Sequence, residues 1–284
     1  MATEANLEES KMPLLDHLIE LRRRLVYSIA GFILAFFACF YVADELFNFL
    51  VAPLANLWEG EENRRLIFTA LHEKFFTNIK VAFFAAAFIS FPLVAAQFWT
   101  FVAPGLYKDE KRAMIPFLVA TPILFLAGGA LVYYMVMPVA WRFFASFQSL
   151  GGGDELAIEL LPKVGEYLSL VMRLIFAFGI SFELPVVITL LARVGMTSSE
   201  GLKRKRRYAI VLAFVAAAIL TPPDPLSQIS LALPIIGLYE ISIWSARLVE
   251  RKREEEDATD DDDDDDDDDG DDDDEDEDPE DDED

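Results

Sequence analysis

The sequence predicts an all-α polytopic membrane protein with six transmembrane helices. Two observations lead to this fold class. The chain of 284 residues is 53% hydrophobic with a mean hydropathy of +0.27, which is too apolar for a soluble domain. Its apolar residues also gather in runs, and a helix needs roughly 20 such residues to cross ~30 Å of hydrocarbon. The six runs are residues 25–42, 81–102, 113–141, 167–191, 208–220 and 226–244.

The formal net charge of -25 belongs to the C-terminal tail and not to the membrane region. Residues 254–284 hold 27 of the 49 acidic side chains, and the rest of the chain is nearly neutral. Such a segment has nothing apolar to bury and repels itself, so we expect it to be disordered. We divide the chain into a flexible N-terminus (1–11), a membrane domain (12–248) and an acidic cytoplasmic tail (249–284).

The distribution of basic residues predicts the orientation of the spans, because Lys and Arg accumulate in cytoplasmic loops. With six spans, 17 of the 24 basic residues fall on one side and six on the other, which predicts that both termini are cytoplasmic. The fifth run has only 13 residues, about 20 Å of helix. It either crosses where the bilayer is thinned or pairs with the sixth run as a re-entrant hairpin.

Two features indicate how the first run continues. It is long and lacks a small-residue cleavage site, so we expect it to stay attached as an anchor and not to be removed as a signal peptide. After it, the apolar residues Leu46, Phe47, Leu50 and Val51 precede Pro53. Their spacing predicts a short helix in the membrane interface.

Catalytic and metal-binding motifs are missing from the sequence. His17 and His72 are the only histidines, and Cys39 is the only cysteine. His72-Glu73 lacks the second histidine of a zinc-protease motif, and the sequence contains no phosphate-binding glycine loop. We therefore expect no enzyme activity, no metal, no cofactor and no nucleic-acid partner.

Glu183 and Arg173 are charged residues inside the fourth run. A carboxylate near mid-membrane costs roughly 2.5–3.5 kcal/mol unless it is protonated or partnered. Glu183 is either a protonated group bonded to a neighbouring helix or a polar contact for a partner helix or a substrate path. Arg173 lies ten residues earlier, ~15 Å along a helix, so the two cannot pair directly.

Prolines interrupt the third and fourth runs. Each removes a backbone donor, which bends the helix and helps to form a concave bundle. The residues concerned are Pro116, Pro122, Pro138 and Pro185.

Glu20 and Glu110 are acids among basic neighbours on the predicted cytoplasmic face. Taken alone, each is a solvated charge, and Glu20 can form an i, i+4 ion pair with Arg24. These two acids nevertheless lie in segments that resemble the TatC family, the receptor subunits of the twin-arginine protein translocase. The resemblance covers residues 12–248, and its four hallmark segments are 17–25, 101–112, 178–185 and 220–224.

The resemblance implies a concave, glove-like bundle in which the fifth and sixth spans both cross. By motif position, Glu20 and Glu110 match the acids that bind paired arginines of signal peptides, and Glu183 matches the acid that contacts partner subunits. A carboxylate accepts the guanidinium fork in a bidentate manner, which lysine does not offer. Further positions that match motif residues are Arg22, Gln97, Phe101, Pro53 and Asp224.

The partners that the resemblance implies are twin-arginine signal peptides of folded precursors, single-span subunits similar to TatA and TatB, membrane lipid and further copies of the chain. It places the protein in the bacterial cytoplasmic membrane, where the protonmotive force drives export. The Asp-rich tail and Arg173 are outside the family pattern. A second hypothesis is a secondary transporter or channel in which Arg173 and Glu183 line one path.

Overall fold

The computed structural model of the chain is helical through most of its described part, as the sequence predicts. It describes the backbone of residues 2–58, 65–106, 111–149, 156, 158–221 and 225–263, and the side chains of these residues except 2–16, 102–106, 111–115, 226 and 253–263. The elements are α1 (Ala2–Tyr41), α2 (Ala43–Ala55), η1 (Asn56–Trp58), α3 (Glu73–Leu106), α4 (Lys111–Leu131), η2 (Val132–Val136), α5 (Met137–Ala145), α6 (Val164–Ser181), α7 (Leu184–Arg193), α8 (Ser199–Leu220) and α9 (Pro225–Asp263).

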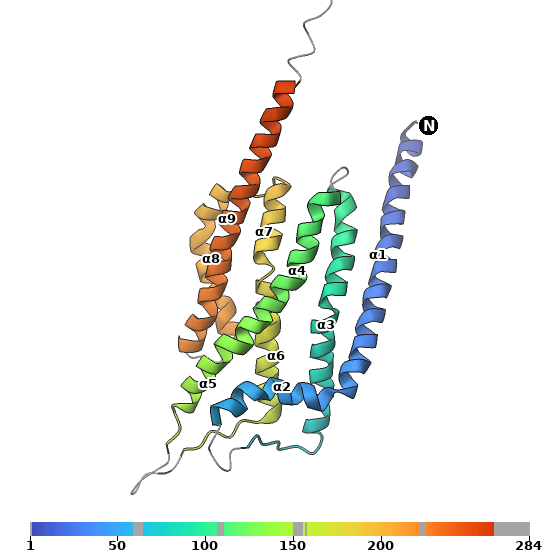
Figure 1. Cartoon of the computed structure of the whole chain (residues 1–284). Coiled ribbons are helices and arrows are strands. Elements are labelled where there is room, and N and C mark those ends of the chain that lie inside the picture. The colour runs from blue at the N-terminus through green and yellow to red at the C-terminus, as the bar shows by residue number, and fades with distance from the viewer. Residues whose placement is uncertain are drawn as a thin grey trace, which may run out of the picture.

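The long helices run side by side as one bundle (Figure 1). The bundle has two distinct ends. The end at which α1 begins and α9 leaves the bundle is called the terminal end, and the end crossed by α2 is called the cap end. The short helix expected around Leu50 is present as α2 (Ala43–Ala55), which lies across the bundle axis (Figure 1).

Five helical segments within the described residues are long and apolar enough to cross a membrane. They are His17–Tyr41, Glu73–Phe101, Pro116–Ala145, Val164–Arg193 and Ser227–Lys252. The sixth helix, α8, has 22 residues and a length of about 33 Å, but its first half is strongly basic. It packs along α9, where Tyr239 Oη donates to the Leu202 carbonyl over 2.8 Å and Gln228 Nε2 donates to the Phe214 carbonyl over 3.2 Å. Its length favours a crossing helix over a re-entrant one.

Two of the spans are interrupted. The third contains the π-helical segment η2 just before Pro138, which lacks the N–H that the preceding turn needs. The fourth stops at Ser181 and restarts at Leu184, with Pro185 in the first turn of α7. The other two prolines of the third run do not break α4, which continues through both. Half of the predicted interruptions are therefore observed.

Small residues let α4 and α6 approach closely. The side chains of Phe125 and Phe178 are fully buried between them. A Cβ atom on Gly128 would lie 2.6 Å from the Phe178 carbonyl oxygen, and one on Gly179 would lie 2.6 Å from the Phe125 ring. Glycine is required at both places because membrane helices gain their contact from van der Waals packing rather than from the hydrophobic effect.

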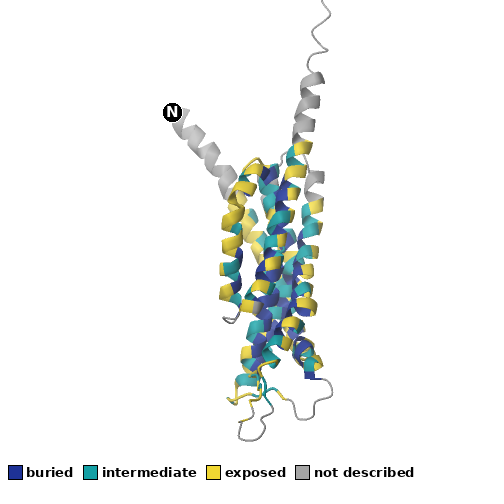
Figure 2. Cartoon of the chain, turned by 90° about the vertical axis from the view of Figure 1, so that its left-hand side faces the viewer, coloured by how far each residue is buried: buried dark blue, intermediate teal, exposed yellow. Residues whose placement is uncertain are grey.

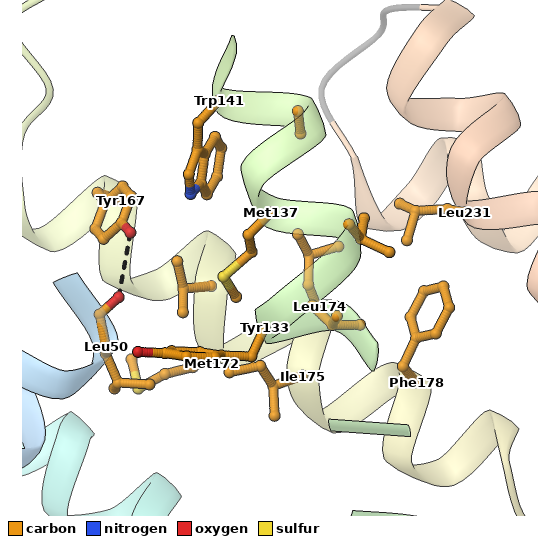
Figure 3. Packing of buried hydrophobic residues seen from close by; sticks show 14 of the residues in the cluster. Leu50, Tyr133, Met137, Trp141, Tyr167, Met172, Leu174, Ile175, Phe178 and Leu231 are labelled. Atoms are coloured by element: carbon orange, nitrogen blue, oxygen red, sulfur yellow. Dashed lines mark hydrogen bonds between the residues drawn. The ribbon is translucent and has the colours of Figure 1, made fainter. Parts of the chain in front are cut away.

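The largest buried cluster lies toward the cap end (Figure 3). Two tyrosines attach α2 to it. Tyr167 Oη donates to the Leu50 carbonyl over 3.2 Å, and Tyr133 Oη donates to the Phe49 carbonyl over 2.7 Å. These bonds fix α2 against η2 and α6, so the cap end is a packed structure and not an open loop.

The first and last helices extend beyond the membrane region that the sequence predicts. Helix α1 begins at Ala2, inside the segment 1–11, and α9 continues to Asp263, inside the segment 249–284. The reason is that extending an existing helix avoids the cost of nucleation, and glutamate and alanine favour helix. Most described side chains of α1 are exposed, which suits a helix that contacts lipid along most of its length. Across the rest of the bundle, buried residues lie mainly along the middle and exposed ones along the outer faces (Figure 2).

Candidate functional site

Glu20 and Arg24 lie one turn apart on α1 near the terminal end. Arg24 Nε donates to Glu20 Oε1 over 2.9 Å, and Arg24 Nη2 donates to the same oxygen. The side chains are only 17% and 28% exposed for Arg24 and Glu20, respectively. The structure therefore contains the ion pair that the sequence left as one interpretation of Glu20. Both bonds use one of the two carboxylate oxygens.

Two contacts tie this part of α1 to α3. Arg24 Nη1 donates to Gln97 Oε1 over 3.5 Å, and the ring of His17 stacks on that of Phe101 with centroids 4.2 Å apart. Gln97 and Phe101 are one turn apart on α3, so both contacts come from one face of that helix. Through Arg24 and His17, the structure thus places the Glu20 segment of α1 against the face of α3 that carries Gln97 and Phe101.

His17 and Arg24 were not among the residues predicted for the site. The signal was present in the sequence, because His17, Glu20 and Arg24 follow the i, i+3, i+7 spacing of one helix face. Arg24 holds the Glu20 carboxylate in place, and His17 supplies a flat surface for α3. Together with Gln97 and Phe101 they form the terminal-end cluster.

The other predicted residues do not join this cluster. Arg22 is exposed on α1 and has no partner among the described side chains. Pro53 is buried in α2 at the cap end, far along the bundle from Glu20. Glu110 and Asp224 lie outside the described residues.

Glu183 occupies the turn between α6 and α7, where it is the N-cap residue of α7. Its Oε1 atom is buried and has no hydrogen-bond partner in the described part of the chain. The Thr121 side chain on α4 is a polar neighbour of the carboxyl group. Trp99 Nε1 on α3 donates to Thr121 Oγ1 over 2.9 Å. Polar side chains from α3, α4 and the α6–α7 turn therefore lie next to one another. The last of them, Glu183, has an oxygen atom, Oε1, that can still accept a hydrogen bond.

Thr121 and Trp99 were missed by sequence reasoning. A threonine or tryptophan inside an apolar run is common, so neither residue type carries a signal by itself. Their contact depends on the packing of α3 against α4. What the arrangement can do chemically is accept a hydrogen bond at Glu183 from a donor on another helix.

At the cap end, Asp44 of α2 forms a hydrogen bond and an ion pair with side chains of α3. Asn78 Nδ2 donates to Asp44 Oδ1 over 3.1 Å, and Lys74 Nζ lies 3.4 Å from the same oxygen. The Asn78 hydrogen bond, followed by the bond and charge of Lys74, holds the pKa of the Asp44 carboxyl below its usual range. Lys74 also lies over the Phe47 ring, 3.4 Å from its centroid.

Taken together, the fold and the site define a multi-pass helical membrane protein with a cluster of polar contacts at each end and a buried acid between α6 and α7. Within the described residues, no group of three His, Cys, Asp or Glu side chains can hold a metal ion. The profile of the family described as Sec-independent protein translocase protein (TatC) matches residues 16–234. The chain belongs to the TatC family. This family is a membrane component of a protein translocase and not an enzyme.

Relatives and solved structures agree with this assignment. The TatC protein of Magnetococcus marinus is 53% identical over 245 residues, which cover 86% of this chain and 88% of that protein. The TatC protein of Escherichia coli K12 is 40% identical over 239 residues, which cover 84% of this chain and 90% of that protein. The crystal structure of the twin arginine translocase receptor TatC is 39% identical, with a TM-score of 0.69 over 82% of this chain and 99% of that chain. The six-helix fold that the sequence predicts is therefore confirmed.

Proposed function

We propose that this chain is the subunit of the translocase that binds twin-arginine signal peptides at the terminal end of the bundle. The observation that carries the proposal is the Glu20 carboxylate, held between α1 and α3 with only one oxygen engaged by Arg24. Glu110 is the second acid, on the basis of its motif position. The solved relative is described as the twin arginine translocase receptor TatC, which supports the same role.

The chemistry at Glu20 suits an incoming guanidinium. A carboxylate has about four lone-pair positions, and Arg24 uses those of Oε1. Glu20 Oε2 accepts no hydrogen bond from a described residue, so a signal arginine can bind there or exchange with Arg24. The two guanidinium groups are chemically alike, which makes this exchange nearly balanced in energy. A lysine offers a point charge without the planar fork and replaces Arg24 less well.

Glu183 is the proposed contact for the single-span subunits. Its unpartnered oxygen is buried in the bundle, and burying a polar atom without a bond costs free energy. A hydrogen-bond donor on an added helix would remove that cost.

The proposed orientation places the terminal end in the bacterial cytoplasm. The basic residues 203–207 at the start of α8 lie at this end, in agreement with the rule for cytoplasmic loops. No bond is made or broken by the chain itself. The protonmotive force acting on the assembled complex supplies the energy for export of folded precursors.

The transporter hypothesis loses its main support in the structure. It requires Arg173 and Glu183 to line one path. The largest described cavity is lined by Arg173 but not by Glu183. We therefore propose no transport path through these two residues.

Peptide binding to the purified protein tests the receptor role. We expect a twin-Arg signal peptide to bind the wild type at least tenfold more tightly than its twin-Lys counterpart, since hydrogen bonds to charged groups contribute about 1.5–3 kcal/mol. Glu20→Gln and Glu110→Gln should each remove this preference. The matched control is Glu45→Gln, which neutralises an exposed carboxylate on α2 at the other end of the bundle. Equal binding of both peptides to every variant would contradict the proposal.

Copurification tests the partner contact separately. Single-span subunits should copurify with the wild type, less with Glu183→Gln, which retains one acceptor, and least with Glu183→Leu, which retains none. If Glu183→Leu retains its partners fully while remaining folded, the contact is elsewhere.

A further inference from the structure

Two adjoining hollows between α3 and α6 share the same two cations. The larger is a cavity of about 840 Å³ toward the cap end, and its lining includes Lys80 and Arg173. The smaller, about 440 Å³, is lined by Lys80, Arg173 and the apolar side chains of Ile79, Phe83 and Met172, among others. We call these two hollows the α3–α6 groove. Lys80 and Arg173 are both exposed, so the groove opens to the surroundings of the bundle.

The acids near the groove are already engaged. The Glu73 carboxylate accepts bonds from the backbone N–H groups of Thr69 and Gly165, over 2.9 and 3.1 Å. Glu166 pairs with Lys163 over 3.5 Å. Lys80 and Arg173 have no hydrogen bond or ion pair with any described residue. Backbone donors leave the charge of Glu73 in place, so the lining of the larger hollow carries three cations and two acids. Lys80 and Arg173 are the cations that pair with no described acid.

The two cations lie at matched heights in the membrane. Helices α3 and α6 begin at the same end of the bundle, where the bond between Glu73 and the Gly165 backbone joins them. Lys80 is seven residues beyond Glu73 and Arg173 is eight residues beyond Gly165, about 10 and 12 Å along the two helices. The apolar helix Glu73–Phe101 is about 44 Å long, close to the full bilayer thickness of ~40–45 Å. With ~30 Å of hydrocarbon, the boundary to the headgroups lies about 5–8 Å from the helix end, so the two Cα atoms are a few Å inside the hydrocarbon. The long Lys and Arg side chains bring their charges from there to the headgroup boundary.

We propose that the α3–α6 groove binds an anionic phospholipid of the leaflet at the cap end. Its phosphate would lie between Arg173 and Lys80. Arginine contributes a planar fork that matches phosphate oxygens, and lysine contributes a compact charge. The acyl chains would lie along Phe83 and Met172. The two cations would share the single negative charge of the phosphodiester, and the acyl chains would cover the apolar wall, which free phosphate cannot do.

Lipid titration of the detergent-purified chain tests this site. Native mass spectrometry would count bound dioleoyl phosphatidylglycerol and, in a parallel series, dioleoyl phosphatidylcholine with the same acyl chains. The site variant is Lys80→Gln, Arg173→Gln. The charge-matched control is Arg142→Gln, Lys205→Gln, which removes two exposed cations outside the groove. Thermal unfolding of both variants would establish that each is folded.

The wild type and the control should bind phosphatidylglycerol in preference to phosphatidylcholine. The site variant should bind phosphatidylglycerol about 30-fold more weakly, because each basic residue near a membrane surface contributes roughly fivefold. Inorganic phosphate should not displace the lipid. Unchanged phosphatidylglycerol binding by a folded site variant, or equal loss in the control, would overturn the proposal. Displacement by inorganic phosphate would also overturn it, because the occupant would then be the free anion.

Discussion

The imidazole ring of His17 on α1 stacks on the ring of Phe101 on α3, with centroids 4.2 Å apart and an interplanar angle of 16°. This contact and the bond from Arg24 to Gln97 are what hold the Glu20 segment against the rest of the bundle. Farther along α1, Gly31 lies against Leu93 and Phe32 packs on Phe83, so the two contacts near Glu20 serve the terminal end of the helix. The geometry of the terminal-end cluster therefore depends on an aromatic stack.

Phe101→Ala should release this segment of α1. Aromatic pairs contribute about 0.5–1.5 kcal/mol beyond their buried area. We expect amide hydrogens around Glu20 to exchange faster, by about three- to tenfold, and twin-Arg peptide affinity to fall. Phe101→Tyr retains the ring and should behave as the wild type. Unchanged exchange in Phe101→Ala would show that the stack does not hold α1.

Thr121→Val should destabilise the centre of the bundle. The substitution preserves shape but removes the acceptor of Trp99 Nε1 and a polar neighbour of Glu183. A buried donor left without a partner costs about 1–3 kcal/mol. The measurement is chemical unfolding in detergent, together with a change in tryptophan emission. Thr121→Ser keeps the hydroxyl group and should lose much less. Equal stability of the two variants would mean that the polar chain contributes nothing.

Gly128→Ala and Gly237→Ala should act in opposite directions. A Cβ atom at Gly128 would lie 2.6 Å from the Phe178 carbonyl oxygen, so α4 and α6 must separate. Overpacking of this kind costs about 1–3 kcal/mol. At Gly237 no heavy atom lies within 4 Å of the added atom, so the variant should gain up to about 1 kcal/mol of helix propensity. Thermal unfolding of both variants in one detergent provides the comparison, and a tolerated Gly128→Ala would contradict the close approach.

Asp44→Asn should make the unfolding midpoint less dependent on pH in the acidic range. The pKa of Asp44 is lowered in the folded chain, first by the Asn78 bond and then by Lys74. Its contribution is therefore fully present above the unfolded value of about 3.9 and is lost as pH falls through the lower folded value. The unfolding midpoints of the wild type and the variant should differ at neutral pH and converge below about pH 4. Glu45→Gln, which changes an exposed acid on the same helix, is the control. A constant difference across this range would exclude the ion pair as its source.

The sequence predicted the helical segments well because the signal for a membrane span is local. An apolar run of sufficient length must form a helix in lipid, since every backbone group has to be bonded within the segment. The short helix α2 followed from the same local spacing. The helical continuation of α9 to Asp263 was not predicted, because strong charge indicated disorder while helix propensity and continuity acted the other way.

Within the site, the sequence identified the charged residues Glu20 and Glu183 but not the side chains that they contact. Glu183 was recognised from its cost in the membrane, and Glu20 from its motif position. That Trp99 and Thr121 meet at Glu183, that His17 stacks on Phe101, and that Lys80 and Arg173 share one groove were decided by tertiary structure. Composition and periodicity determine which side chains lie on each face of a single helix. Contacts between helices depend on which faces pack together and on the relative positions of the helices along the bundle axis. No local sequence pattern carries that information.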